Sequence, residues 1–368
     1  MNHVVSVVGL VTHLGRGVQR IATDTVIGPA RSLPRTIGDL DTAYLSQVMG
    51  RTVTSVSVIG GDAGTSSRAR LELSGANVPN SVFVKMPAET VATRMMGELG
   101  RLAATETRFY RELSSQLNGV PECFGSAFDP LTGRFVLVLE DLAADGCEFP
   151  DTLNPLSGDQ ASQIVELLGR LHGTFWGRIP NWLYTASDDS TSLLTGSLLK
   201  ASARRIAERT DIPVERGRFI DENYRAVARL IDRSPHTVMH GDAHPGNVYF
   251  RKGAAGLLDW QAMRSGHPSR ELAYTLITSM TADDRRANQR EILDEYRRAL
   301  AAAAGGPDLD RDDLWERYRQ GALYAYVAAL ITAGMGGMQD EGIALEGLRR
   351  AVAALEDLDT VTVLRKSL

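Results

Sequence analysis

Residues 238 to 250 read VMHGDAHPGNVYF, and they place His240, Asp242, His244 and Asn247 in one short stretch. The flanking residues are β-branched, aliphatic or aromatic, which is typical of short strands. A helix is disfavoured here because Pro245 lacks a backbone N–H and clashes with the preceding turn. We therefore expect a polar loop between two short strands.

A transition-metal site is one interpretation of this loop, because His240, Asp242 and His244 are all competent ligands. Zinc motifs with two histidines four residues apart place both on one face of a helix, which Pro245 disfavours. A metal-dependent hydrolase that uses the HGDAH turn is therefore an alternative function.

Phosphoryl transfer is the other interpretation, because it needs a carboxylate that orients the attacking hydroxyl and oxygen ligands for Mg²⁺. Asp242 and Asn247 have the spacing of the catalytic Asp and the metal-binding Asn in the kinase loop H-R-D-x-x-x-x-N. Twelve residues after Asn247, the segment AAGLLDWQ presents Asp259 at the end of an apolar strand. A second metal ligand is expected at such a position.

Length and composition limit the class of protein. A chain of 368 residues is too long for one small core, so we expect two domains or one two-lobed domain. Hydrophobic residues make up 43% and charged residues 23%, and no stretch is apolar enough for a membrane helix, so no membrane partner is expected. The net charge of −5 and the scattered arginines argue against a nucleic-acid partner. Only two cysteines are present, which fits a reducing compartment and predicts a cytoplasmic location.

The pattern along the chain predicts an α+β fold. The apolar start VVSVVGLV has no preceding Lys or Arg, so residues 1–40 are expected to form an N-terminal helix or arm and not a signal peptide. Alternating apolar residues predict strands at 52–60, 68–75, 81–86, 122–128 and 134–142, with one long helix at 89–117. Residues 41–141 should therefore form a small antiparallel-sheet lobe, and residues 142–368 a larger, mainly helical lobe.

The motifs HGDAHPGN and LLDW, with GHPSRELAYTL downstream, resemble the aminoglycoside phosphotransferase and choline kinase superfamily. Its pattern is HGDxxxxN followed, after a short spacer, by an Asp. The phrases VKMPA, ETRFYREL and VLVLEDL are similar, in that order, to its ecdysteroid-kinase-like branch. The resemblance covers residues 52 to 280, and it implies a protein-kinase-like two-lobed fold and a kinase that phosphorylates small molecules.

The resemblance implies a role for each candidate site residue. Lys85, in SVFVKMPA, would hold the α- and β-phosphates of ATP, with GTP as the alternative nucleotide. Glu106 would pair with Lys85; Glu98 competes on spacing alone, but the match of ETRFYREL favours Glu106. Asp242 would act as the catalytic base, and Asn247 and Asp259 would hold Mg²⁺.

A nucleotide loop is expected between the first two strands, where residues 60 to 68 read GGDAGTSSR. Gly61, Gly64, Thr65 and Ser66 are the candidates for phosphate contact, because backbone N–H groups of such a segment can approach phosphates closely. The alternative is a plain hairpin turn without a ligand.

Several residues depart from the family pattern or have a simpler structural interpretation. Glu271 stands where relatives often carry Asp, and we expect it to hold the catalytic loop. Trp260 follows Asp259 in place of Phe-Gly, so the DFG switch of regulated protein kinases should be absent. His240 is interpreted as a loop-shaping residue and His172 as a buried core histidine.

The acceptor is expected to be a small hydroxylated molecule and not a protein, because no activation loop or APE segment follows Asp259. Aminoglycoside, sugar, amino alcohol and sterol-like acceptors all remain open, since no dense acidic cluster marks a site for a polycation. A nucleotide-binding pseudokinase without transferase activity is a further alternative.

Overall fold

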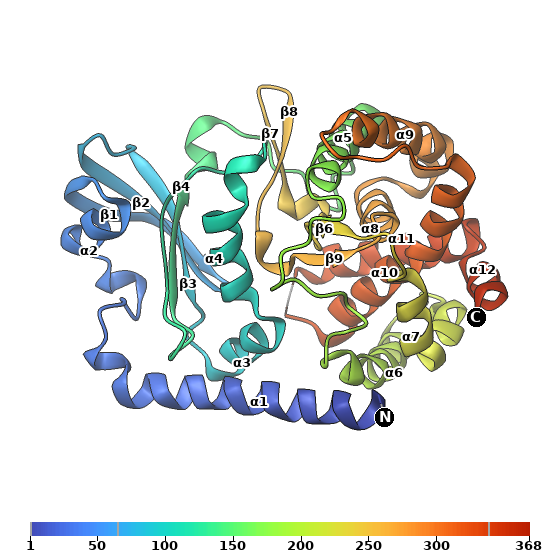
Figure 1. Ribbon diagram of the computed structural model, residues 1–368, viewed down its shortest axis with the longest axis horizontal. Coiled ribbons are helices and arrows are strands. Elements are labelled where there is room, and N and C mark those ends of the chain that lie inside the picture. Colours follow the sequence, from blue (N-terminus) through green and yellow to red (C-terminus); the bar gives the residue numbers. More distant parts are fainter. Residues whose placement is uncertain (1, 65, 338) are drawn as a thin grey trace. The chain divides into compact units, whose positions relative to one another are not determined.

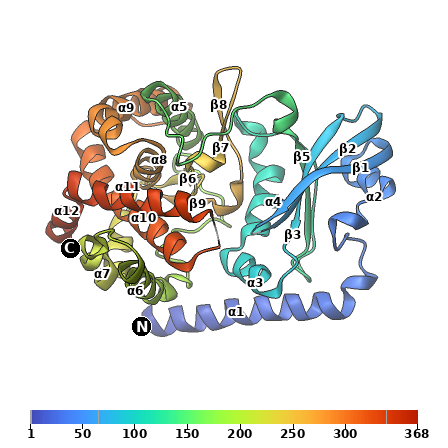
Figure 2. The same cartoon turned by 180° about the vertical axis from the view of Figure 1, so that it is seen from behind.

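The computed structural model describes residues 2–64, 66–337 and 339–368. The chain divides into two compact units (Figures 1 and 2). The first, called here the sheet unit, contains the chain up to Cys147 together with Leu258–Ala262. The second, the helical unit, contains Glu148–Leu257 and Met263–Leu368. The short segment 258–262 therefore brings Asp259 into the unit that contains Lys85.

The sheet unit is built on five antiparallel strands in the order β1-β2-β3-β5-β4. The strands are β1 (Thr52–Ala63), β2 (Ser66–Ala76), β3 (Ser81–Pro87), β4 (Cys123–Phe128) and β5 (Phe135–Glu140). This confirms the five-stranded antiparallel sheet expected from the alternating pattern. The expected loop at residues 60–68 is much shorter than predicted, because pairing between β1 and β2 continues as far as Ala63 and Ser67.

Strand β3 is buried on both faces, which places its lysine. Val84 and Met86 belong to an apolar core shared with Leu45 of α2 (Thr42–Met49). Because side chains alternate across a strand, Lys85 points to the opposite face. That face carries helix α4 (Leu102–Glu112), which lies against the sheet in Figure 1.

The single helix predicted at residues 89–117 is wrong: the segment forms two helices, α3 (Val91–Gly100) and α4. The break falls at Arg101, whose φ of 54° lies in the left-handed region. Gly97 and Gly100 precede it, and glycine is a weak helix former, which explains why the chain turns here. The consequence is that α4, which carries Glu106, has a direction of its own.

Helix α1 (Asn2–Ile27) packs against α3 and is anchored by a buried charge. Asp24 is 1% exposed and lies 2.6 Å from Nη1 of Arg94, and it also accepts hydrogen bonds from the Arg134 guanidinium. Burial alone would raise the pKa of Asp24, but the hydrogen bonds from Arg134 and Arg94 hold that pKa below its usual value. The carboxylate therefore stays charged and ties the helix to the sheet unit.

The helical unit confirms the mostly helical second part. Its helices are α5 (Gly158–Thr174), α6 (Ser192–Arg209), α7 (Arg218–Ile231), α8 (Ser269–Ser279), α9 (Ala282–Ala302), α10 (Arg311–Met335), α11 (Glu341–Asp357) and α12 (Thr360–Ser367). Two short antiparallel pairs interrupt them: β6 (Thr237–Met239) with β9 (Arg264–Gly266), and β7 (Val248–Arg251) with β8 (Ala254–Leu257).

Helix α8 is the centre of this unit, because every one of its residues is buried. It packs against α10, while α5 packs against α9. None of the helices in the described part of the chain is long and apolar enough to cross a membrane.

Candidate active site

The HGDAHPGN segment forms a structured loop between β6 and β7. Gly241 has a φ of 87°, a conformation that glycine tolerates and other residues rarely adopt. Residues Pro245–Asn247 form a 3₁₀ turn, and the His244 side chain accepts a hydrogen bond from the Gly246 N–H at 3.1 Å. His244 thus serves as a turn cap, and the expectation of a loop between two strands is confirmed.

Asn247 is held against Asp242 within this loop. Its Nδ2 donates to the backbone oxygen of Asp242 at 2.9 Å and to the Asp242 carboxylate at 3.2 Å. The amide oxygen of Asn247 therefore points its lone pairs away from these two contacts and can serve as a ligand for a hard cation. The Asp242 side chain is 32% exposed, so its carboxylate is accessible to a small molecule.

Tyr274 is a partner of Asp242 that the sequence analysis missed. Its hydroxyl donates to Oδ1 of Asp242 at 2.9 Å. Burial, followed by the nearby Asp242 charge, raises the pKa of Tyr274 well above its usual value, so the hydroxyl keeps its proton. The sequence contains a signal for this contact, because Tyr274 lies three residues after Glu271 and therefore shares a helix face with it.

Glu271, on the same face of α8, holds the backbone of the loop in place. Its Oε1 accepts from the Gly241 N–H at 2.5 Å and its Oε2 accepts from the His240 N–H at 3.1 Å. Nε2 of His172 lies 2.8 Å from the same Oε2, and its Nδ1 lies 3.0 Å from the Tyr296 hydroxyl. Burial would raise the pKa of Glu271, but the hydrogen bond from His172, the electrostatic influence of His172 and His240, and the hydrogen bond from the Gly241 N–H keep that pKa below its usual value.

This network agrees with the interpretation of Glu271 as a support for the catalytic loop. It also agrees with the interpretation of His172 as a satisfied core histidine, since its ring is fully buried and both of its nitrogens have partners. His240 is fully buried as well, and its Nδ1 accepts from the Asp242 N–H at 3.3 Å. His240 thus shapes the loop directly, and His172 supports it through Glu271.

A second group of site residues lies in the sheet unit. Nζ of Lys85 donates to both carboxylate oxygens of Glu106, at 2.8 and 2.7 Å, and to Oδ1 of Asp259 at 2.9 Å. Lys85 is 4% exposed and Glu106 is 1% exposed. Glu98, the competing partner, instead forms an ion pair with Arg20 at 2.7 Å.

One ammonium is thus shared by two carboxylates. Burial would lower the pKa of Lys85, but attraction to Asp259 and Glu106 raises it, so the lysine stays charged. For Glu106, burial outweighs the stabilising charge of Lys85 and raises the pKa to about 7. The two carboxylates exceed the single ammonium in charge, so the arrangement favours the arrival of further positive charge at the carboxylates.

Trp260 anchors the segment that carries Asp259. Its ring stacks on Phe109 of α4 with centroids 4.0 Å apart and an angle of 10° between the ring planes. Asp259 itself has a φ of 63°, in the left-handed region. A buried aromatic pair thus fixes the position at which the Asp259 carboxylate meets Lys85.

The expected nucleotide loop is a tight hairpin. Gly61 pairs with Ala69 inside β1, and a Cβ at Gly61 would come within 2.7 Å of the Arg68 carbonyl oxygen, so this position needs glycine for close strand packing. Gly64 donates to the Ser66 carbonyl at 3.0 Å, and Thr65 lies outside the described residues. Phosphate contact by these residues remains a prediction.

Two oxygen donors suit the magnesium ion that the sequence resemblance implies. Asn247 offers an amide oxygen and Asp259 a carboxylate, which are the hard ligands that Mg²⁺ prefers. Across the described ranges, no group of three or more His, Cys, Asp or Glu side chains is arranged to hold a metal on its own.

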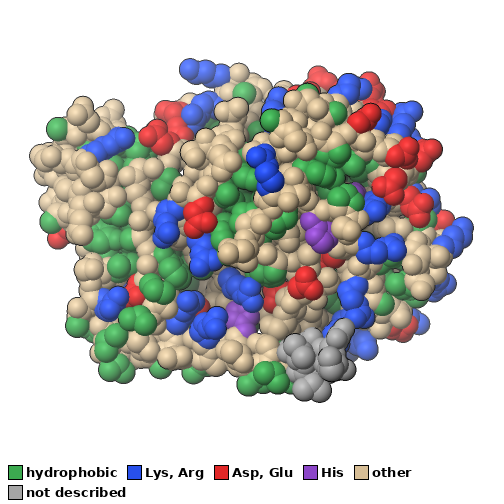
Figure 3. All heavy atoms as spheres, viewed as in Figure 1, with side chains coloured by type: hydrophobic (Ala, Val, Ile, Leu, Met, Phe, Trp, Pro, Cys, Tyr) green, Lys and Arg blue, Asp and Glu red, His purple; other side chains and the backbone are tan. Residues whose placement is uncertain are grey.

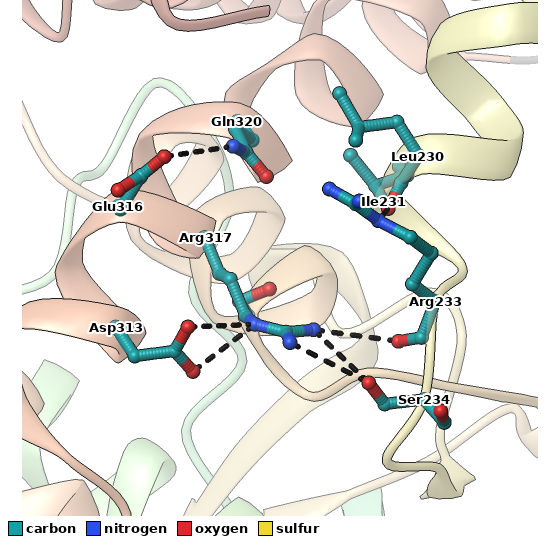
Figure 4. A pocket seen from close by; sticks show the side chains of 9 residues that line it. Leu230, Ile231, Arg233, Ser234, Asp313, Glu316, Arg317 and Gln320 are labelled. Carbon is teal, nitrogen blue, oxygen red and sulfur yellow. Dashed lines mark hydrogen bonds and ion pairs between the residues drawn. The ribbon is translucent and has the colours of Figure 1, made fainter. Parts of the chain in front are cut away.

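A pocket of about 400 Å³ opens elsewhere on the helical unit (Figure 4). Its polar groups bind one another: the Arg317 guanidinium lies 3.1 Å from the Asp313 carboxylate and 3.4 Å from the carbonyl oxygens of Arg233 and Ser234. It contains none of the predicted site residues. On the face shown in Figure 3, Lys and Arg side chains are interspersed with Asp and Glu side chains.

Solved structures of other proteins show which fold this chain has. A protein of Ralstonia eutropha JMP134, assigned by inference to the aminoglycoside phosphotransferases, has a TM-score of 0.57 at 14% identity, covering 87% of this chain and 97% of that one. Plasmodium vivax ethanolamine kinase has a TM-score of 0.52 at 12% identity, covering 85% and 84%. A GDP complex of a variant aminoglycoside 2'-phosphotransferase IIIa has a TM-score of 0.51 at 12% identity, covering 86% and 97%. The fold is therefore the kinase-like fold expected from the sequence.

The family follows from the sequence itself. The model of the "Phosphotransferase enzyme family" matches residues 83–320, well over half of the chain, and the protein belongs to this family. No curated protein sequence matches the chain significantly. The superfamily resemblance is confirmed, while the ecdysteroid-kinase-like branch stays a prediction.

Proposed function

We propose that this protein is a Mg²⁺-dependent kinase that transfers the γ-phosphate of ATP to a hydroxyl group of a small molecule. The observation that carries the proposal is the environment of the Asp242 side chain. Its carboxylate is partly exposed, is oriented by Tyr274 and Asn247, and sits on a loop that the buried Glu271 braces. Such a carboxylate is suited to receive the proton of an acceptor hydroxyl.

Each unit contributes one set of side chains to the proposed reaction. In the sheet unit, Lys85 would bind the α- and β-phosphates, and Glu106 would keep its ammonium in place. In the helical unit, Asp242 would orient the acceptor hydroxyl and take its proton as the oxygen bonds to the γ-phosphorus. The bond between that phosphorus and the bridging oxygen breaks, and ADP leaves with the electron pair.

Asn247 and Asp259 would hold Mg²⁺, which neutralises charge on the phosphates when bound. Because the transition state is loose and anionic, positioning and charge neutralisation account for most of the rate enhancement. Losing the Asp242 carboxylate should therefore lower kcat far more than it lowers nucleotide affinity. GTP is the alternative donor under this proposal.

The acceptor is proposed to be a small hydroxylated compound. The activities named for the fold relatives, on aminoglycosides and on ethanolamine, support a small acceptor and not a protein. We place the reaction in the cytoplasm, because the two cysteines, Cys123 and Cys147, are free.

Mass spectrometry of phosphorylated products tests the proposal. Purified protein is incubated with Mg·ATP and a panel of aminoglycosides, sugars, amino alcohols, sterols and hydroxy acids, in parallel with Asp242→Asn. A product that gains one phosphoryl group with the wild type and vanishes with the variant is expected. Unaltered ATP across the panel, with nucleotide still stabilising the fold, would instead support a pseudokinase.

A further inference from the structure

A cluster of one arginine and several tyrosines lies next to the catalytic loop in the helical unit. We call it the arginine–tyrosine cluster; it consists of Arg264, Tyr184, Tyr224 and Tyr324. The Arg264 guanidinium lies over the Tyr184 ring, 5.3 Å from its centroid, and it is an electrostatic neighbour of Tyr224 and Tyr324. Nothing in the proposed reaction uses this cluster.

Two contacts place the cluster beside Asp242. Arg264 pairs with Met239 across β6 and β9, and Met239 precedes Asp242 by three residues. The Tyr324 hydroxyl donates to the carbonyl oxygen of Gly241 at 3.0 Å, and the Tyr324 ring lies 5.1 Å from the Tyr274 ring. A molecule that presents its hydroxyl to Asp242 would therefore meet these side chains.

Two acidic groups beside the cluster, Asp232 and Asp189, are already engaged. Asp232 is 2% exposed at its side chain; one oxygen lies 3.2 Å from Arg270 and the other accepts from the Ser187 N–H at 2.7 Å. Asp189 is 4% exposed, and its Oδ1 accepts from the Thr191 N–H at 3.0 Å. These carboxylates are in no position to bind a polycation.

Arg264 differs from the other charged groups of this region. Its side chain is 22% exposed, and the one hydrogen bond that its guanidinium makes within the described residues is a long contact of 3.5 Å to Asp189. Arg270, in comparison, is 6% exposed, paired with Asp232 and stacked 3.9 Å above the Tyr324 ring. Arg264 therefore keeps most of its five N–H donors for a ligand.

A guanidinium fork matches the two oxygens of a carboxylate or the oxygens of a phosphate, and partly exposed tyrosine rings contact flat or apolar groups. We propose that the acceptor is a hydroxylated compound with an anionic group bound by Arg264 and a flat or apolar body that contacts the tyrosines of the cluster. This inference rests on the proposed kinase function, and it goes beyond that function by naming an acidic acceptor class in place of a polycation.

Binding and transfer are measured separately to test this inference. Isothermal titration calorimetry, with wild type, Arg264→Gln and Arg264→Lys, uses hydroxylated aromatic carboxylates, sugar acids and sugar phosphates. Each acidic probe is compared with its neutral amide or alcohol and with an aminoglycoside. Arg229→Gln, an exposed arginine change on α7 outside the cluster, is the matched control.

At least one acidic probe should bind the wild type. The same probe should bind Arg264→Gln at least tenfold more weakly. It should bind Arg264→Lys with intermediate affinity, because lysine keeps the charge but lacks the forked guanidinium. The neutral counterparts should bind all variants alike, and Arg229→Gln should bind as the wild type does. A urea denaturation curve for each variant separates lost binding from lost folding.

Absence of binding by every acidic probe, or equal binding by wild type and a folded Arg264→Gln, would overturn the inference. Transfer from Mg·ATP is measured on the same probes. Phosphorylation of neutral or cationic compounds alone would keep the kinase function and overturn the acidic acceptor. Acidic probes that bind through Arg264 but are never phosphorylated would keep the inference about binding and count against the kinase function.

Discussion

Replacing Glu271 by Gln should destabilise the helical unit and slow catalysis, because this carboxylate accepts three hydrogen bonds in a buried site. The donors are the N–H groups of His240 and Gly241 and Nε2 of His172; an ionised carboxylate can only accept, so Nε2 must be the donor. Gln keeps one oxygen and places an amide N–H₂ where the second oxygen was. One of the three donors that contacted the carboxylate then faces the amide N–H₂ and has no acceptor.

The magnitude follows from these contacts. A buried donor left without an acceptor costs about 1 to 3 kcal/mol, and the two remaining hydrogen bonds lose about 1 kcal/mol each when their acceptor loses its charge. The free energy of unfolding should therefore fall by about 4 kcal/mol. Because Glu271 contacts the loop and not Lys85, kcat should fall while the KM for ATP stays the same.

Urea denaturation followed by tryptophan fluorescence measures the stability change, and steady-state kinetics measures kcat. Glu166→Gln on α5 is the matched control: Glu166 is 45% exposed, its ion pair with Arg170 spans 3.6 Å, and its loss should cost less than about 0.5 kcal/mol. If Glu271→Gln unfolded at the wild-type urea concentration, the loop-bracing account would be refuted.

Three further changes have defined outcomes. Burial raises the pKa of Glu106 to about 7 from 4.5, so between these values the native state holds a proton that the unfolded state has lost. The unfolding free energy of the wild type, relative to that of Glu106→Gln, should fall by up to about 1.4 kcal/mol per pH unit as the pH rises from about 5 to about 7, and should level off above pH 7. Urea denaturation curves of both proteins at each pH check this. A difference between the two proteins that stays the same at every pH would contradict it. Tyr274→Phe removes the hydroxyl that donates to Asp242, so kcat should drop several-fold, equivalent to about 1 kcal/mol, with the KM for ATP unchanged. An unchanged kcat would show that this hydrogen bond makes no contribution to catalysis. Phe109→Ala removes a fully buried ring stacked on Trp260 and should lower the unfolding free energy by about 3 to 5 kcal/mol and weaken ATP binding; calorimetric titration with ATP would show unaltered affinity if the stack had no such role.

The sheet and the polar loop that carries Asp242 were predictable because their signals are local. Alternating apolar residues identify the five strands, and the spacing of Asp242 and Asn247 needs no knowledge of distant parts of the chain. The position of Lys85 was also within reach, since a lysine between Val84 and Met86 must face away from their core. The choice of Glu106 over Glu98 as the partner of Lys85 could not be made from local signals. Both glutamates lie at plausible sequence distances from Lys85, and only the family motif favoured Glu106.

The helix break and the tyrosine contacts were harder to predict. Apolar spacing continues across residues 89–117, so periodicity alone gives one helix, although Gly100 and the left-handed Arg101 end it. Tyr324 reaches the loop from α10, 83 residues away in sequence from Gly241, and no local pattern indicates such a contact. Long-range packing of this kind is a property of the folded chain.

Measuring γ-phosphoryl transfer and nucleotide binding in the same preparations tests most directly whether Asp242 is the base of a kinase. ³¹P NMR records conversion of Mg·ATP to ADP and a phosphorylated acceptor, while calorimetric titration records ATP affinity, for wild type and Asp242→Asn. We expect acceptor-dependent transfer by the wild type, loss of that transfer in Asp242→Asn, and ATP affinities that agree within about twofold. Transfer by Asp242→Asn at the wild-type rate would contradict it.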